Sequence, residues 1–405
     1  MLIIKMAFRN IFRQRRRTIL TGLSMLVGFT LAVIFIGWGD GTYNNIIDEF
    51  TRNRLGHIQI HEKTYLDRPS LYKTIQESDD LANILDSTKG IESWTPRLFS
   101  AGLVSVGEKT AGVQILGIDP IREDQTTQFD KKILQGRNFS RIPSKEAIIG
   151  KGLAQILKAE LDDEIVIISQ AADGSIANDL YTIIGISSSG DDISDRSSFY
   201  LHLREAQELL VLDGRIHEIA LLVKKLNHVL KTNNLLASEI NNPDLSVSPW
   251  QVFAKAFYDA MQADKAGSYV MLIIIVFIVA VGVLNTVLMS VLERQREYGV
   301  MKAIGTKPKQ IIKLVVIEVT ILAIICIILG SGLGYGANTF LSKHGIKFGE
   351  GITYGGMKFE TMKAEINLRS FLIPAVTVIL CAALVSLLPA IKAARTEPAK
   401  TMRFH

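Results

Sequence analysis

The residues of this chain best suited to act on a partner lie in a charged segment between two apolar runs. Glu293, Arg294, Arg296 and Glu297 follow the first run, and residues 299–304 have the composition of a short helix. Gly305 and Pro308 predict the end of that helix before the next run. A simple turn would need only a few residues, whereas this segment has about twenty. We therefore expect a lever that tilts two neighbouring helices together.

The sequence carries no motif for nucleotide hydrolysis or for other familiar catalysis. It contains no G-x-x-x-x-G-K-[ST] phosphate loop, no H-E-x-x-H helix, no G-x-S-x-G elbow and no cysteine cluster. We therefore expect no enzyme activity and no cofactor in this chain, and a partner must supply any energy. His57 and His61 share one predicted strand, but a metal site needs more ligands, so we interpret them as surface histidines and expect no metal site.

Glu318 is an acidic residue about two turns inside an apolar run. An ionisable group at such a position is a functional candidate by default. Its depth is only about 9 Å, close to the basic segment. We interpret it as the partner of Arg294 or Arg296, with proton relay as the alternative.

Four apolar runs, 19–38, 269–292, 312–335 and 370–391, stand out in a chain of 405 residues that is 48% hydrophobic. Each run is long enough to cross a hydrocarbon core of about 30 Å. The first run could be a secretory signal, but it is longer than a signal core and no small-x-small cleavage pattern follows it. We predict four membrane spans, the first of them an uncleaved anchor.

The charge distribution predicts the orientation of these spans. Residues 1–18 hold six basic and no acidic side chains, residues 293–313 six and two, and residues 392–405 four and one. Residues 41–292 instead hold 24 basic and 32 acidic side chains. The positive-inside rule then places both termini in the cytoplasm, and the basic excess predicts contact with anionic lipids rather than nucleic acid.

The predicted fold class is a membrane protein of four transmembrane α-helices with a large extracytoplasmic α+β domain between helices 1 and 2. Strand patterns at 56–62, 103–119, 164–170 and 181–187 and helix patterns at 151–161 and 203–212 support this class. Asp173-Gly174 predicts a hairpin turn, and the helical pattern before span two predicts an outward stalk. Gly330/Gly334 and Gly332/Gly336 predict close helix packing in lipid.

The predicted segments follow one another along the chain. They are an amphipathic helix (1–18), span one (19–40), the outer domain (41–267), span two (268–292), the coupling segment (293–311), span three (312–335), a short outer loop (336–369), span four (370–391) and a cytoplasmic tail (392–405). The outer domain divides into an inner lobe of about 41–120 and 215–267 and an inserted lobe of about 121–214.

Four stretches carry a resemblance to a known family. The segment ERQREYGVMKAIGTKPKQI resembles the coupling segment of FtsX-like ABC-transporter permeases, which include MacB, LolC and LolE. LPAIKAARTEPAKTMR is similar to the family's C-terminal pattern, and MAFRNIFRQRRRTILT to its N-terminal one. The stretch 134–169 resembles the inserted lobe of the family's outer domain.

This resemblance implies a permease in a bacterial inner membrane, with its large domain periplasmic and no fused ATPase domain. An ABC ATPase dimer would bind ATP and magnesium, and a second permease copy or paralogue would complete the complex. The residues expected to couple to the ATPase are Glu293, Arg294, Glu297, Gly299, Lys302, Ala303 and Gly305.

The expected output is extraction of lipoproteins from the membrane, with Leu23, Val27 and Leu31 on one helical stripe lining a cavity for acyl chains. The layout is closest to that of LolC and LolE. The alternatives are MacB-like export, FtsX-like regulation of a cell-wall hydrolase, and a membrane sensor or scaffold without transport.

Overall fold

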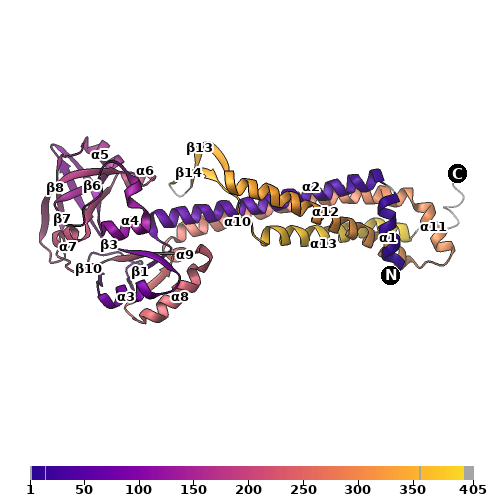
Figure 1. Ribbon diagram of the computed structural model, residues 1–405, viewed down its shortest axis with the longest axis horizontal. Helices are drawn as coiled ribbons and strands as arrows, with labels where there is room; N and C mark the ends of the chain where they lie inside the picture. The colour runs from indigo at the N-terminus through magenta and orange to yellow at the C-terminus, as the bar shows by residue number, and fades with distance from the viewer. Residues whose placement is uncertain (1, 14, 355–356, 396–405) are drawn as a thin grey trace. The chain divides into compact units, whose positions relative to one another are not determined.

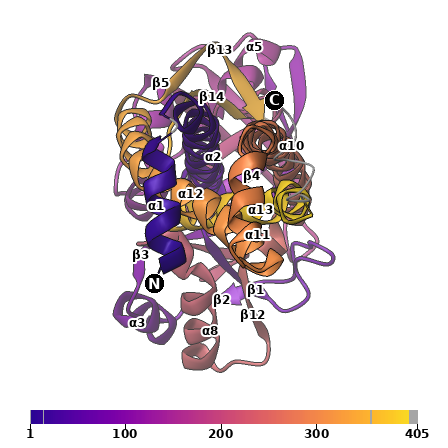
Figure 2. The same ribbon diagram turned by 90° about the vertical axis from the view of Figure 1, so that its right-hand side faces the viewer.

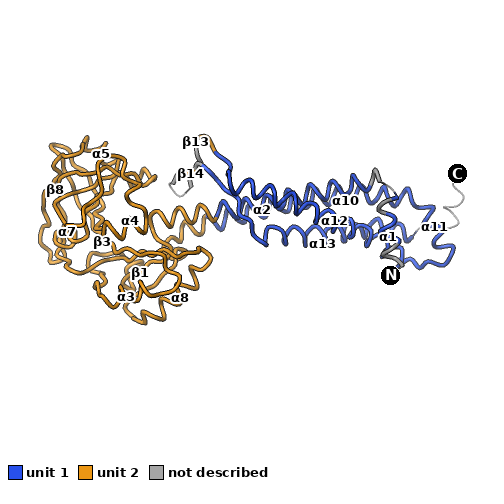
Figure 3. Tube along the Cα trace, in the orientation of Figure 1, with its two compact units in different colours: residues 1–43, 261–347, 361–405 blue, residues 44–260, 348–360 orange. Residues whose placement is uncertain are grey.

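The computed structural model describes residues 2–13, 15–354 and 357–395 in two compact units (Figure 3). One unit comprises residues 1–43, 261–347 and 361–405, and the other residues 44–260 and 348–360. Most of the predicted tail at 392–405, with much of the C-terminal pattern, lies outside the described residues.

The first unit is a bundle built from long helices (Figures 1 and 2). Its helices are α1 (Leu2–Arg13), α2 (Arg15–Phe50), α10 (Lys255–Glu293), α11 (Gln295–Ala303), α12 (Pro308–His344) and α13 (Arg369–Ala394), of which α2 and α10 also give residues to the second unit. Within the described residues, four of these are long and apolar enough to cross a membrane, with mean hydropathy of 2.4 to 2.9. α12 continues to His344, beyond the predicted end of span three at 335.

Glycines bring α12 close to α2. A methyl group added to Gly330 would lie 2.6 Å from Phe29 Cδ1, and one on Gly334 would lie 2.7 Å from Val33 Cγ1. Both distances are too short for a real side chain, so only glycine permits this approach. The predicted contact is therefore confirmed for this pair. Gly332 and Gly336 make no such contact within the described part of this chain, since no described atom lies within 4 Å of a methyl group added there, and their helix contact stays a prediction.

The second unit is the α+β domain, whose main sheet has the strand order β12-β1-β11-β3-β4-β9-β6-β8-β5, with β7 pairing with β3 and β8. The strands are β1 (Ile58–Glu62), β2 (Ile75–Gln76), β3 (Ile91–Val106), β4 (Lys109–Ile118), β5 (Ile133–Gly136), β6 (Glu146–Gly150), β7 (Glu164–Gln170), β8 (Ile176–Ser187), β9 (Ser198–His202), β10 (Arg215–Ile216), β11 (Glu218–Val223) and β12 (Leu245–Pro249). A separate hairpin comprises β13 (Ile346–Tyr354) and β14 (Met357–Met362). This hairpin lies in the segment predicted as a short outer loop.

Short helices accompany the main sheet. They are α3 (Asp79–Ser87), α4 (Pro120–Thr127), α5 (Lys151–Leu157), α6 (Asp192–Asp195), α7 (Leu203–Leu209), α8 (Val229–Ile240) and α9 (Trp250–Phe253), with further turns at η1 (Thr51–Leu55), η2 (Phe129–Lys132) and η3 (Leu226–His228).

The long strand β3 joins the two halves of the main sheet. Its first part pairs with β11, and its second part pairs with β4 and β7. The hairpin turn between β7 and β8 is present, with Gly174 at a φ of +87° that favours glycine. The division of the domain into two lobes stays a prediction.

The interpretation of His57 and His61 as surface histidines is wrong. Their exposed fractions are 0% and 1%, and the His61 ring stacks on Tyr65 with ring centres 5.1 Å apart. His57 Nδ1 accepts a hydrogen bond from the Val223 amide at 3.0 Å, and His61 Nε2 lies 3.3 Å from Glu218 Oε2. Within the described residues, no group of three or more potential ligands could hold a metal ion.

Candidate functional site

The junction of α10, α11 and α12 has the features expected of a coupling element. α10 ends at Glu293, and Arg294 breaks the helix before α11 begins at Gln295. The short helix predicted over 299–304 therefore begins earlier, at Gln295. α11 ends before Ile304, and Gly305 then takes a φ of +99° that other residues rarely adopt. Pro308 begins α12, where its missing N–H costs no hydrogen bond.

Arg294 is the centre of this junction. Only 6% of the Arg294 surface is exposed. The guanidinium donates to Glu318 Oε2 at 3.0 Å and to Glu297 Oε2 at 3.0 Å. It also lies 5.3 Å from the ring centre of Tyr298. The predicted pairing of Glu318 is therefore confirmed, with Arg294 as its partner.

Electrostatics favour the charged form of Arg294. Burial alone would lower the pKa of the guanidinium, but Tyr298, Glu318 and Glu297 outweigh it and raise that pKa. The guanidinium therefore stays charged, and its two carboxylate partners hold α11 against α12.

Two further contacts fix α11 to the bundle. Tyr298 is 1% exposed and belongs to the same buried cluster as Val291, Ile311 and Ala393, from three other helices. Lys302 Nζ donates to the carbonyl oxygen of Ala394 at 2.9 Å, near the end of α13. A cation is favoured there because the last carbonyl groups of a helix carry partial negative charge. α11 is therefore attached to three helices.

The N-terminal helix α1 joins the same network. Asn10 Nδ2 donates to Glu318 Oε2 at 3.3 Å, and Arg13 Nη1 lies 3.3 Å from Glu297 Oε1. Both side chains of the Arg13 pair are exposed by 40% or more, so solvent weakens that pair. Figures 1 and 2 place α1 and α11 at the same end of the bundle.

The other side of α11 is exposed. We call the exposed residues Glu293, Arg296, Val300, Ala303 and Ile304 the exposed stripe. Arg296, Val300 and Ala303 are three to four residues apart on α11 and so share one side of it, while Glu293 ends α10 and Ile304 directly follows α11. Ile304 is 79% exposed. An isoleucine and a valine beside charged residues form a small amphipathic surface that suits contact with another protein.

The predicted coupling residues therefore fall into two groups. Glu293 and Ala303 lie on the exposed stripe, with Gly305 exposed directly after it, whereas Arg294 and Gly299 are buried. Glu297 and Lys302 are partly buried and hold the helix in place. The sequence reasoning did not find Asn10, because a polar residue on an amphipathic helix reads as part of its solvent-facing side.

Leu23, Val27 and Leu31 lie on one exposed stripe of α2, each about half exposed. The structure holds one chain, so it does not bring these residues together with a second copy. Their role in an acyl-chain cavity stays a prediction.

Comparison with known proteins assigns the chain to a family. Residues 18–236 match the family model of the MacB-like periplasmic core domain, and residues 269–398 match that of the FtsX-like permease C-terminal region. The chain belongs to the FtsX-like, MacB-type permeases. This permease therefore consists of four transmembrane helices and a MacB-like periplasmic α+β domain, as predicted.

Several relatives of this permease align over most of its length. It is 20% identical to the lipoprotein-releasing system transmembrane protein LolC of Neisseria meningitidis, over 96% of this chain and 94% of the relative. It is 22% identical to LolE of Haemophilus influenzae, over 94% and 93%. It is 21% identical to the macrolide export ATP-binding/permease protein MacB 2 of Aeromonas hydrophila, over 98% of this chain and 60% of that protein.

Among solved structures, the periplasmic region of MacB from Actinobacillus actinomycetemcomitans matches 50% of this chain and 92% of its own, with 18% identity and a TM-score of 0.37. Permeases of this family work with an ABC ATPase, so nucleotide and magnesium belong to that ATPase. The exposed stripe on α11 is the surface of this permease that we consider for such a partner.

Proposed function

We propose that this permease extracts lipoproteins from the bacterial inner membrane, driven by a separate ABC ATPase dimer that docks on the exposed stripe of α11. The observation that carries the proposal is the two-sided design of α11. One side is fixed to three helices, and the other offers Val300, Ile304 and charged residues to a partner. Nucleotide-driven closure of the ATPase would displace α11, and α10 and α12 would follow.

The network around Arg294 would transmit this displacement. A short helix joined only by its backbone could rotate without moving its neighbours. Arg294, Glu318 and Tyr298 remove that freedom, because each is held between α11 and another helix. Asn10 and Arg13 would carry α1 along with the junction. We propose that both termini are cytoplasmic, in agreement with the basic excess at this end.

The lipoprotein substrate is proposed from the relatives LolC and LolE, which are named as transmembrane proteins of lipoprotein-releasing systems. We propose that Leu23, Val27 and Leu31 face acyl chains where two permeases meet. Their exposed, purely aliphatic side chains suit that contact.

The proposal is tested in proteoliposomes that hold the full-length permease, its ATPase and a fluorescent triacylated lipoprotein. Ile304→Asp places a charge on the exposed stripe without touching the buried contacts. We expect it to weaken ATPase binding by about tenfold or more and to slow lipoprotein release equally, because it buries an unpaired charge in the contact. Lys309→Asp is the control, because it places an aspartate on the exposed start of α12, outside the exposed stripe.

Four outcomes would contradict the proposal in different ways. Full ATPase binding by the Ile304→Asp variant would show that the ATPase does not dock on the exposed stripe. Normal ATPase coupling with release of a macrolide but not of lipoprotein would favour MacB-like export, and stimulation of a cell-wall hydrolase would favour FtsX-like regulation. A membrane sensor or scaffold predicts that no ATPase copurifies at all.

A further inference from the structure

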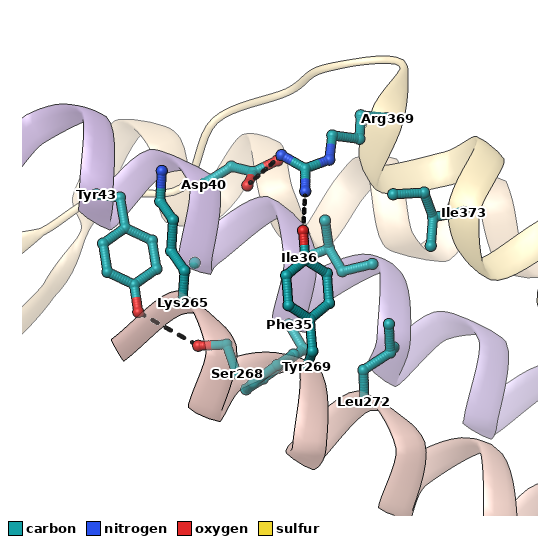
Figure 4. A pocket seen from close by; sticks show the side chains of 11 residues that line it. Phe35, Ile36, Asp40, Tyr43, Lys265, Ser268, Tyr269, Leu272, Arg369 and Ile373 are labelled. Carbon is teal, nitrogen blue, oxygen red and sulfur yellow. Dashed lines mark hydrogen bonds and ion pairs between the residues drawn. The ribbon is translucent and has the colours of Figure 1, made fainter. Parts of the chain in front are cut away.

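A second charged site lies on α2, α10 and α13, and Figure 4 shows its side chains. A pocket of about 60 Å³ opens there between α2, α10 and α13. Its polar rim holds Asp40, Lys265, Tyr269 and Arg369. These residues come from the ends of three predicted spans, so they lie at one level where the apolar part of each helix stops. The site has no part in the coupling described above.

The rim carries more positive than negative charge. Asp40 accepts from Asn367 Nδ2 at 3.0 Å and lies 3.5 Å from Arg369 Nη1. Its one negative charge is thus shared with Arg369. In the described part of the chain, Lys265 has no carboxylate within ion-pair distance, and its ammonium lies 5.1 Å from the ring centre of Tyr43. One full positive charge is left for a ligand.

The rim also has spare hydrogen-bond donors. Tyr269 accepts from Arg369 Nη2 at 2.7 Å, so its own hydroxyl proton points elsewhere. No acceptor for that proton lies among the residues that the structure describes. Lys265, Tyr269 and Arg369 can together donate to the oxygens of one anion, in the manner of charge-assisted phosphate contacts. Figure 4 shows the three side chains around the mouth of the pocket.

Below the rim, the wall of the pocket is apolar. Phe35, Ile36, Leu272 and Ile373 line it, and each belongs to a predicted membrane span. A free phosphate ion would gain nothing from these residues. A phospholipid would place its phosphate at the rim and an acyl chain along the wall, because tyrosine, lysine and arginine mark the interface level of a membrane protein.

We infer that this pocket binds the phosphate group of an anionic phospholipid, with Lys265, Tyr269 and Arg369 as its donors. The net positive charge favours an anionic headgroup over a zwitterionic one. The bound lipid belongs to the bilayer and not to the cargo, so this inference stands whether or not the permease releases lipoproteins.

The test is native mass spectrometry of the full-length permease in mild detergent, titrated with phosphatidylglycerol, with phosphatidylcholine of the same acyl chains, and with inorganic phosphate. We expect the first phosphatidylglycerol to bind about tenfold more tightly than phosphatidylcholine, and inorganic phosphate not to compete. Lys265→Gln should weaken phosphatidylglycerol binding about tenfold, the effect of one charged hydrogen bond. Lys265→Arg should retain binding.

Two control variants separate the pocket from general surface charge. Lys343→Gln removes an exposed cation near the same end of the bundle, outside the pocket, and should leave binding unchanged. Gly39→Leu adds a large side chain to a residue that lines the pocket, where an added methyl group meets no described atom within 4 Å, so it should block binding without disturbing the fold. Gly332→Leu is its matched control on the open side of α12.

Each remaining outcome overturns the inference. Equal losses in Lys265→Gln and Lys343→Gln would mean that only surface charge attracts the lipid. Competition by inorganic phosphate would make the pocket a simple anion site. Unchanged phosphatidylglycerol binding by Gly39→Leu, eluting as a monodisperse protein, would place the lipid elsewhere.

Discussion

Glu318→Gln is the most direct perturbation of the coupling junction. The change keeps the size of the side chain but removes the charge that faces Arg294 at 3.0 Å. Arg294 then remains buried with Glu297 as its one carboxylate partner among the described residues. We expect the bundle to lose stability and the contact between α11 and α12 to weaken.

The expected magnitude follows from the geometry. Two unit charges 3.0 Å apart attract each other by about 5 kcal/mol in an effective dielectric constant of about 20. Removing one partner of a buried pair costs about 3–5 kcal/mol, because the other charge stays buried. Glu318 is 18% exposed on its side chain and Glu297 still accepts from Arg294. We therefore expect a loss at or just below the lower limit of that range, about 2–3 kcal/mol.

The measurement is reversible unfolding of the full-length permease in mixed micelles, carried out as a double-mutant cycle with Arg294→Gln. If the two residues act through each other, the double variant should lose less than the sum of the single losses, with a coupling energy of about 1–2 kcal/mol. Arg296→Gln is the control, because it removes an exposed arginine from the same helix and should cost less than about 0.5 kcal/mol. Additive losses in the cycle would refute the reasoning.

Three further predictions concern other contacts. Gly330→Ala and Gly334→Ala should each destabilise the bundle by about 1–3 kcal/mol by overpacking against Phe29 and Val33, whereas Gly332→Ala should be neutral or stabilising in the same unfolding assay. Burial raises the pKa of Glu218 to about 7 from its usual 4.5, so the folded state keeps a proton that the unfolded state loses as pH rises between these values. The stability of Glu218→Gln relative to the native chain should therefore increase from about pH 4.5 to 7 and then level off, and a flat difference in thermal unfolding would contradict this. Phe257→Ala should destabilise the second unit by about 3 kcal/mol, because Phe257 is buried and stacks on Phe50 with ring centres 3.9 Å apart. Tyr258→Ala should cost clearly less, because Tyr258 is only partly buried.

The membrane part of the fold was predictable because its signal is local. A run of about twenty apolar residues has few alternatives to a membrane span. The partner of Glu318 was equally accessible, because an acid inside such a run needs a cation, and Arg294 lies at the foot of the neighbouring run. Packing between the helices was not local. Gly330 and Gly332 are each followed by a second glycine four residues later, yet only Gly330 lies against α2.

Several strands of the second unit were not predicted, for a related reason. All six residues of β11 are buried, so its sequence lacks the alternation of polar and apolar residues that identifies a strand with one exposed face. The error at His57 and His61 arose because histidines are often exposed, whereas these two are buried with polar partners on β11. The lipid pocket was hidden because Asp40, Lys265 and Arg369 each end a different apolar run.

The burial of Arg294 and Glu318 bears on function more than on stability. A well-packed apolar pair of similar size often stabilises a protein as much as a buried ion pair or more, so the charges are weak evidence for a purely structural role. What an ion pair adds is direction, because its hydrogen bonds fix the angle between α11 and α12, whereas apolar side chains allow sliding. Arg294→Met with Glu318→Leu should therefore retain a stable bundle while ATP hydrolysis by the docked ATPase no longer drives release. If that double variant released substrate at the normal rate, the ion pair would have only a structural role. Movement of α11 would then have to be transmitted through Tyr298 and Lys302.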